Sequence, residues 1–186
     1  MLAQSMSVQG LLTRSALDLE LAMPTMMKSD ARDPFHVPLP YRMSRKNPKP
    51  KVAVCFETPG FETHPEVEKA LDLAAATLKD AGYKLETAEP PFLKDTAISG
   101  YRALMGEVSE LMGTDIKNNG SKEIQEIFHT YYELFPPYKG TELLQMMAKR
   151  SFYAREWSLF LEKFDLILSP FMPNPYFRPD RDKEGI

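Results

Sequence analysis

Residues 51–89 constrain the fold more than any other part of this sequence. Residues 51–56 form a short apolar run bounded by proline and glycine, which is typical of a buried strand. Residues 65–81 then place apolar side chains at helical spacing opposite a charged face, and Gly82 follows as a helix-terminating residue. Residues 83–88 alternate like a second strand. Strand, helix and strand of this length predict a βαβ unit with two parallel strands.

Further helices and one more strand are expected on either side of this unit. Ser15 and Ser121 are predicted N-caps, and Pro24 should kink the first helix or end it early. Asn118-Asn119-Gly120 is a turn signal. The remaining elements are a helical pattern over residues 92–113, a helix after Gly140 and an apolar strand at residues 164–169. The pattern as a whole predicts an α/β fold with a partial mixed or parallel sheet and several packing helices.

Composition narrows the class of protein. A length of 186 residues suits one domain, and a net charge of −3 argues against a nucleic-acid partner. One cysteine excludes an intramolecular disulfide and fits a reducing compartment. The sequence has no apolar segment that could span a membrane and no signal-peptide pattern at its start, so we expect a cytoplasmic protein. Residues 30–50 are a proline-rich surface connection, and residues 178–186 are expected to be a disordered tail.

The residues alone assemble no active site. The sequence has no Gly-x-Ser-x-Gly elbow and no glycine-rich phosphate loop. Cys55 lies within a strand, which favours a buried hydrophobic role over a reactive thiol. His64 and Glu68 share a helical face, but two ligands make no metal site, and we assign all three histidines structural or surface roles. We therefore predict no catalytic residue, no metal and no cofactor.

A ligand pocket, if one exists, is expected at the carboxyl ends of the parallel strands, where α/β sheets generally bind ligands. Ser169 and Phe171 follow the third predicted strand and are the candidate substrate-binding residues on that argument. The alternative is that Ser169 only ends a strand before a proline turn.

Three stretches, taken in order, resemble the amidase signature family of hydrolases. The first comprises residues 8–19 (VQGLLTRSALDL) and residues 30–34 (DARDP). The second is the βαβ unit, in which HPEV at residues 64–67 is a close match. The third is FDLILSP at residues 164–170. Leu11 and Pro24 depart from the family pattern, which has proline at the first position and an unbroken helix at the second.

The resemblance implies a fold and a chemistry of which this sequence holds only part. The family uses a serine nucleophile, a cis-serine and a lysine, with a Gly-Ser-Ser-Gly-type loop as oxyanion hole, and these motifs precede the first matching stretch. No serine or lysine here matches any of them. We therefore expect residues 1–186 to form a single, truncated amidase-like domain that resembles an incomplete amidase signature fold.

Three functions follow, from different classes. The first is a portion of an amide hydrolase that is inactive alone and whose full-length parent cleaves a carboxamide C–N bond through an acyl-enzyme. The second is a non-catalytic binding or interaction module derived from an amidase, since an incomplete sheet exposes edges and apolar surface. The third is an unrelated small α/β ligand-binding domain. The expected partner is a complementing N-terminal amidase portion or a second copy of the chain, with a small-molecule amide as substrate of the parent enzyme.

Overall fold

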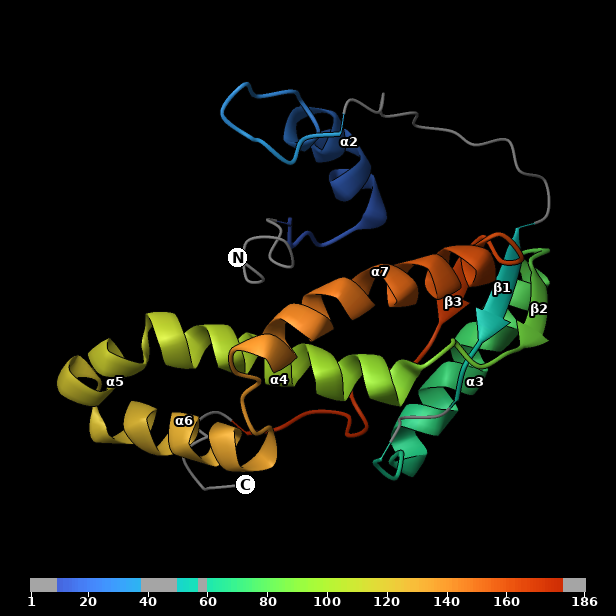
Figure 1. Ribbon diagram of the computed structural model, residues 1–186. Helices are drawn as coiled ribbons and strands as arrows, with labels where there is room; N and C mark the ends of the chain where they lie inside the picture. Colours follow the sequence, from blue (N-terminus) through green and yellow to red (C-terminus); the bar gives the residue numbers. More distant parts are fainter. Residues whose placement is uncertain (1–9, 38–49, 57–59, 179–186) are drawn as a thin grey trace. The chain divides into compact units, whose positions relative to one another are not determined.

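A computed structural model describes residues 10–37, 50–56 and 60–178 (Figure 1). The chain divides into two compact units, one of residues 4–48 and one made chiefly of residues 49–186. The prediction of a single domain stays a prediction, and most of residues 30–50 and of the tail lies outside the described residues.

The larger unit is built on a three-stranded parallel sheet. Its strands are β1 (Lys51–Val54), β2 (Lys84–Thr87) and β3 (Leu166–Leu168), in the order β2-β1-β3. Val52 is in register with Leu85 on one side and with Leu166 on the other. The predicted βαβ unit and α/β class are confirmed, while the third strand is shorter than the apolar run at residues 164–169.

Helix α3 (Pro65–Asp80) joins β1 to β2 and is capped at both ends. At its start the imidazole Nδ1 of His64 accepts a hydrogen bond from the Glu66 amide at 3.2 Å. At its end Gly82 has φ +91°, its amide donates to Lys79 O, and the Tyr83 amide donates to Leu78 O. These two bonds are a Schellman motif, which needs a residue that tolerates left-handed backbone, so the predicted role of Gly82 is confirmed.

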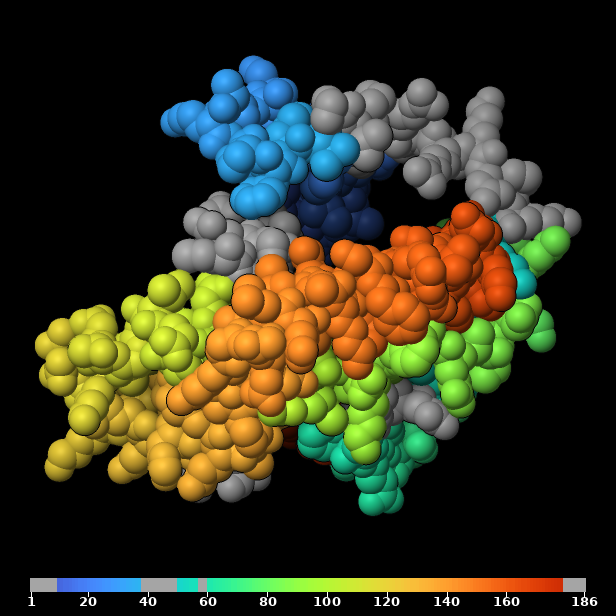
Figure 2. All heavy atoms as spheres, in the orientation of Figure 1, coloured from blue at the N-terminus to red at the C-terminus, as the bar shows by residue number. Residues whose placement is uncertain are grey.

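Four helices lie between β2 and β3. They are α4 (Leu93–Leu111), α5 (Gly113–Asn119), α6 (Lys122–Leu134) and α7 (Thr141–Leu161). α4 leads away from the sheet, and α7 contacts α4 on the way back to β3 (Figure 1). Seen as spheres, α7 covers much of α4 from one side (Figure 2).

The turn predicted at Asn118-Asn119-Gly120 is only partly right. Helix α5 includes both asparagines, and Gly120 alone forms the extended C-cap. Asn119 Nδ2 donates to the Asp115 carboxylate one helical turn earlier, at 2.6 Å. This i, i+4 side-chain bond favours the helix over the local turn that the asparagines would otherwise make. The predicted N-cap Ser121 follows, and its hydroxyl accepts from the Ile124 amide at 3.3 Å.

The loop between α6 and α7 is held against α4 by hydrogen bonds, a cation–ring contact and close backbone packing. Arg102 donates from Nε to Pro136 O at 2.8 Å, and its guanidinium lies 4.0 Å from the centre of the Tyr138 ring. Gly106 lies so close to the Tyr138 backbone that an added Cβ would collide with the carbonyl oxygen. A glycine is therefore required here for close packing of a loop on a helix.

Residues 10–37, the described part of the smaller unit, contain helix α2 (Ala16–Met26) followed by turns at residues 31–32 and 34–35. The Ser15 hydroxyl accepts from the Asp18 amide at 3.1 Å, which confirms the predicted N-cap, and the helix ends two residues after Pro24. In the DARDP segment the Asp30 carboxylate accepts from the Arg32 amide and guanidinium. These bonds, led by the guanidinium, lower the pKa of Asp30 to about 2. The segment thus holds its own turn by side-chain contacts.

The buried core is centred on β1, the strand paired on both sides. Its buried apolar residues lie in β1, in helices α3, α4 and α7, and in the segments next to β1 and β3: Val52, Ala53, Val54, Cys55, Leu71, Ala103, Met105, Tyr153 and Phe164. The predicted burial of Cys55 is confirmed. Within the described ranges, no helix combines the length and the apolar character needed to cross a bilayer.

Candidate functional site

The larger unit has a cavity of about 520 Å³ at the carboxyl end of its sheet, called here the sheet-edge cavity. Cys55 directly follows β1, and Glu89 and Pro90 follow β2 after one further residue, so the strand ends form one side. The first turn of α4 forms the other. The lining residues are Cys55, Gly60, Glu89, Pro90, Phe92, Leu93, Lys94 and Asp95. This is the edge at which parallel sheets generally bind ligands, as the sequence predicts.

Phe92 is the conformational outlier of this cavity. It precedes α4 with φ +55° and ψ +30°, a left-handed conformation that costs a residue with a side chain about 1–2 kcal/mol. Aromatic contacts hold it there, with ring centres 5.2 Å from Phe152 and 6.1 Å from Tyr153. The Thr96 amide and hydroxyl both donate to its carbonyl oxygen. Backbone strain maintained by surrounding packing is concentrated at functional sites in proteins.

Asp95 carries the main electrostatic feature of the cavity. Its Oδ2 accepts a hydrogen bond from the buried Tyr153 hydroxyl at 3.3 Å and lies 3.6 Å from Lys149 Nζ. The pKa of Lys149 is raised above its ordinary value, first by its hydrogen bond with Tyr153 and further by the charge of Asp95. Helix α7 therefore fixes one carboxylate oxygen at the cavity wall and keeps a cation beside it.

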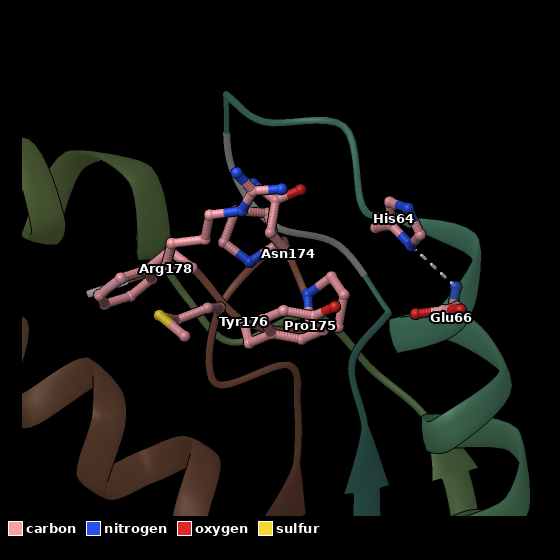
Figure 3. Close-up of a pocket in the computed structure, with 9 residues that line it drawn as sticks. His64, Glu66, Asn174, Pro175, Tyr176 and Arg178 are labelled. Carbon is pink, nitrogen blue, oxygen red and sulfur yellow. Dashed lines mark hydrogen bonds between the residues drawn. The ribbon is translucent and has the colours of Figure 1, made fainter. Parts of the chain in front are cut away.

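A second hollow, of about 740 Å³, lies where the segment after β3 meets the start of α3. Figure 3 shows His64 and Glu66 on one side and Asn174, Pro175, Tyr176 and Arg178 on the other. The backbone amide of His64 donates to Pro173 O at 2.8 Å, which fixes this segment to α3. Because the Nδ1 atom of His64 is engaged as a helix cap, the structure supports the structural role predicted for this histidine.

The two cavities contain polar groups but no set of reacting groups that would make an active site by itself. Of the residues that the structure describes, none lining either cavity is a serine. Among residues 10–37, 50–56 and 60–178, no three histidine, cysteine or carboxylate residues are grouped to hold a metal ion. The sheet-edge cavity can therefore orient a ligand through one aromatic ring and several charges.

The structure places both predicted substrate-binding residues next to β3 and outside these cavities. Ser169 is exposed, and Phe171 is 94% exposed. Met172, the next residue, lines the second hollow. The roles of Ser169 and Phe171 remain predictions, and the residues that line the cavity at this end of the sheet include Cys55 and Glu89, which were not predicted as ligand-binding residues.

Sequence reasoning missed Phe92 and Asp95. The available signal was the Pro90-Pro91 pair after a strand, followed by an aromatic residue and an acidic side chain in the first helical turn. That pattern indicates the start of a helix near the carboxyl end of a strand. It does not indicate left-handed backbone at Phe92 or the contact with Tyr153, because both depend on α7.

Comparison with known proteins matches the Amidase family over residues 1–185. The chain is 30% identical to an indoleacetamide hydrolase of Bradyrhizobium diazoefficiens, over 98% of this chain and 35% of that protein. It is 26% identical to a glutamyl-tRNA(Gln) amidotransferase subunit of Deinococcus deserti, over 95% of this chain and 41% of that protein. It thus spans less than half the length of these curated relatives. Because the family match covers residues 1–185, the chain belongs to the amidase family.

Proposed function

We propose that this chain is the carboxyl-terminal-half portion of an amide hydrolase and is inactive by itself. Membership of the amidase family and the names of the two relatives support amide chemistry. In the family, an activated serine attacks the carboxamide carbon, an acyl-enzyme forms with release of ammonia or an amine, and water then releases the acid. The serine, the cis-serine and the lysine of that scheme have no match in this sequence.

The observation that carries the proposal is the sheet-edge cavity. It lies at the carboxyl ends of β1 and β2 and is bordered by the strained Phe92 and by Asp95. The Phe92 ring and the Asp95 carboxylate line the cavity, and such groups can position a ligand. We propose that the complementing portion brings the nucleophile to this wall.

We further propose that the substrate is a carboxamide carrying an aromatic group. Phe92 is 46% exposed, so part of its ring is available to a ligand in the cavity. Aromatic rings gain stability from stacking or edge contacts beyond the area they bury. The name of the relative at 30% identity, an indoleacetamide hydrolase, supports the same substrate class.

The experiment is an assay with and without the complementing portion. The purified chain is incubated with indole-3-acetamide, and ammonia release is measured. The assay is repeated with the chain co-expressed with the part of the Bradyrhizobium enzyme that lies outside its matched region. We expect no turnover from the chain alone and serine-dependent turnover from the complex. Turnover by the chain alone that a fluorophosphonate blocks would overturn the proposal of inactivity.

The alternative is a non-catalytic amidase-derived binding module. It is favoured by the large apolar side chains that the structure leaves exposed, including Leu73, Leu144 and Phe171. Such surface is typical of proteins that bind a partner. A stable complex with the complementing portion that binds the amide without hydrolysing it would favour this alternative.

A further inference from the structure

One oxygen of the Asp95 carboxylate is held by the protein, and the other is not. Oδ2 accepts a hydrogen bond from the Tyr153 hydroxyl at 3.3 Å and lies 3.6 Å from Lys149 Nζ. Oδ1 accepts no hydrogen bond from any residue that the structure describes. The side chain is 63% exposed and lines the sheet-edge cavity. Because an ionised carboxylate only accepts hydrogen bonds, Oδ1 is suited to an N–H or O–H group of a ligand.

Helix α7 supplies both groups that hold Oδ2. Lys149 and Tyr153 are four residues apart, so their side chains lie on one face of this helix. Tyr153 is 4% exposed, and its ring centre lies 6.1 Å from that of Phe92 and 5.0 Å from Lys149 Nζ. This packing fixes the tyrosine hydroxyl beside α4, and the ammonium group balances the charge of the carboxylate. The orientation of Asp95 is therefore set by a second helix.

Phe92 and Asp95 are spaced to contact two parts of one small ligand. Both line the cavity, and Phe92, which is 46% exposed, directly precedes the helical turn that contains Asp95. Three residues of α-helix span an axial rise of about 4.5 Å. A ligand ring that packs on Phe92 therefore brings a polar group one carbon away from that ring close to Asp95.

A purely structural role for Asp95 explains less of this arrangement. An acidic residue in a first helical turn stabilises the helix through its dipole. That effect depends on charge alone and needs no hydrogen bond from a buried tyrosine 58 residues away. The other charged residues that line the cavity, Glu89 and Lys94, have no side-chain hydrogen bond or ion pair within the described ranges. Of the charged groups in this cavity, Asp95 is thus the one held in a defined orientation.

We propose that Asp95 selects a ligand by the N–H groups of its carboxamide, and that Tyr153 is the positioning residue for Asp95. This inference rests on the proposed function, because it takes an aromatic carboxamide as the ligand. A primary carboxamide can donate an N–H to Oδ1 while its ring packs on Phe92. An ester or a tertiary amide with the same ring has no N–H at that place and leaves Oδ1 without a partner.

The test compares three ligands that share one ring and differ in their N–H groups. They are phenylacetamide, N,N-dimethylphenylacetamide and methyl phenylacetate, and none has a ring N–H that could replace that of the amide. Binding to the purified chain is measured by NMR titration, which needs neither the complementing portion nor turnover. The parent chain should bind phenylacetamide about tenfold more tightly than either other ligand, because a hydrogen bond to a charged group is among the stronger ones.

Three variants test which residues produce this preference. Asp95→Ala should bind all three ligands with affinities within about twofold of one another. Tyr153→Phe keeps the ring that packs on Phe92 and removes only the hydroxyl, so it should lower the preference about threefold. Asp72→Ala is the matched control, since Asp72 is an exposed aspartate on α3, and should keep the preference of the parent. A general loss of structure weakens all three ligands alike and leaves their ratio unchanged.

The outcomes separate this inference from the proposed function. No binding of phenylacetamide by the parent chain, or an unchanged preference in Asp95→Ala, would overturn the role of Asp95. An unchanged preference in Tyr153→Phe would overturn the positioning role. If the chain shows the preference but hydrolyses no amide with the complementing portion, the proposed function is wrong and this inference stands. If that complex hydrolyses amides while Asp95→Ala keeps the preference, the reverse holds.

Discussion

The two ends of the parallel sheet differ in their side-chain contacts and in their backbone strain. At the amino end Lys51 is held by the Asp165 carboxylate through its amide, by Glu86 through its ammonium group and by the Phe164 ring, 4.6 Å away. At the carboxyl end the strands open into a cavity bordered by Phe92 in left-handed backbone. The amino end therefore contributes to stability, and the carboxyl end keeps room for a ligand at a conformational cost.

The largest expected effect on stability comes from a substitution in the packed core around β1. Val52 is 1% exposed, so Val52→Ala removes two methyl groups from a filled core and should lower the free energy of unfolding by about 2–3 kcal/mol. Urea denaturation followed by circular dichroism measures the change. Thr87→Ala, at an exposed position of β2, is the control and should change stability by less than about 0.5 kcal/mol. A similar small change for Val52→Ala would show that the amino end is not tightly packed.

A pair of substitutions at Phe92 tests the strain at the open end. Phe92→Ala and Phe92→Gly both remove the ring, but only glycine adopts the observed φ of +55° without steric cost. We expect the glycine variant to be more stable than the alanine variant by about 1 kcal/mol, the reverse of their order in an unstrained helix. Thermal unfolding of the two proteins side by side gives the difference. Equal stability would mean that the left-handed conformation is not strained.

The smallest expected effects distinguish the Asp165 carboxylate, at the amino end of the sheet, from the Asp95 carboxylate, at the cavity. Asp165→Ala removes the acceptor of the Lys51 amide and should destabilise the chain by about 1 kcal/mol, without changing KM in the complemented enzyme. Asp95→Ala should change stability less, because its side chain is 63% exposed, but should raise KM for indole-3-acetamide. Denaturation curves give the stability of each variant, and steady-state kinetics of each complemented enzyme give its KM. If Asp165→Ala raises KM and Asp95→Ala does not, the division between the two ends is wrong.

Local sequence patterns predicted the local parts of this fold. The caps at Ser15 and Ser121, the helix end at Gly82 and the parallel pair of β1 and β2 depend on residues close together in the chain. For such elements, propensity and hydrogen bonding by neighbouring residues decide the outcome. The helical conformation of Asn118 and Asn119 was missed, because the pattern of turn residues outweighed the possible bond from Asn119 to Asp115.

The candidate site was predictable in place but not in composition. The rule for parallel sheets indicates the carboxyl end of β1 and β2, where the cavity lies. The wall residues Phe92 and Asp95 depend on contacts with Phe152 and Tyr153. Those contacts join α4 to α7 across more than fifty residues of sequence, and no periodicity within either helix predicts them.

The central position of β1 has a consequence for how the chain acquires its structure. β1 can pair with β2 as soon as α3 has formed, but its bond to Asp165 joins residues 114 positions apart. Contacts between residues so distant in sequence slow folding, because a long loop must close before any pairing energy is gained. During synthesis, the β3-facing edge of β1 therefore stays unpaired while the four helices α4–α7 are made. An unpaired strand edge in this interval makes the nascent chain prone to aggregation.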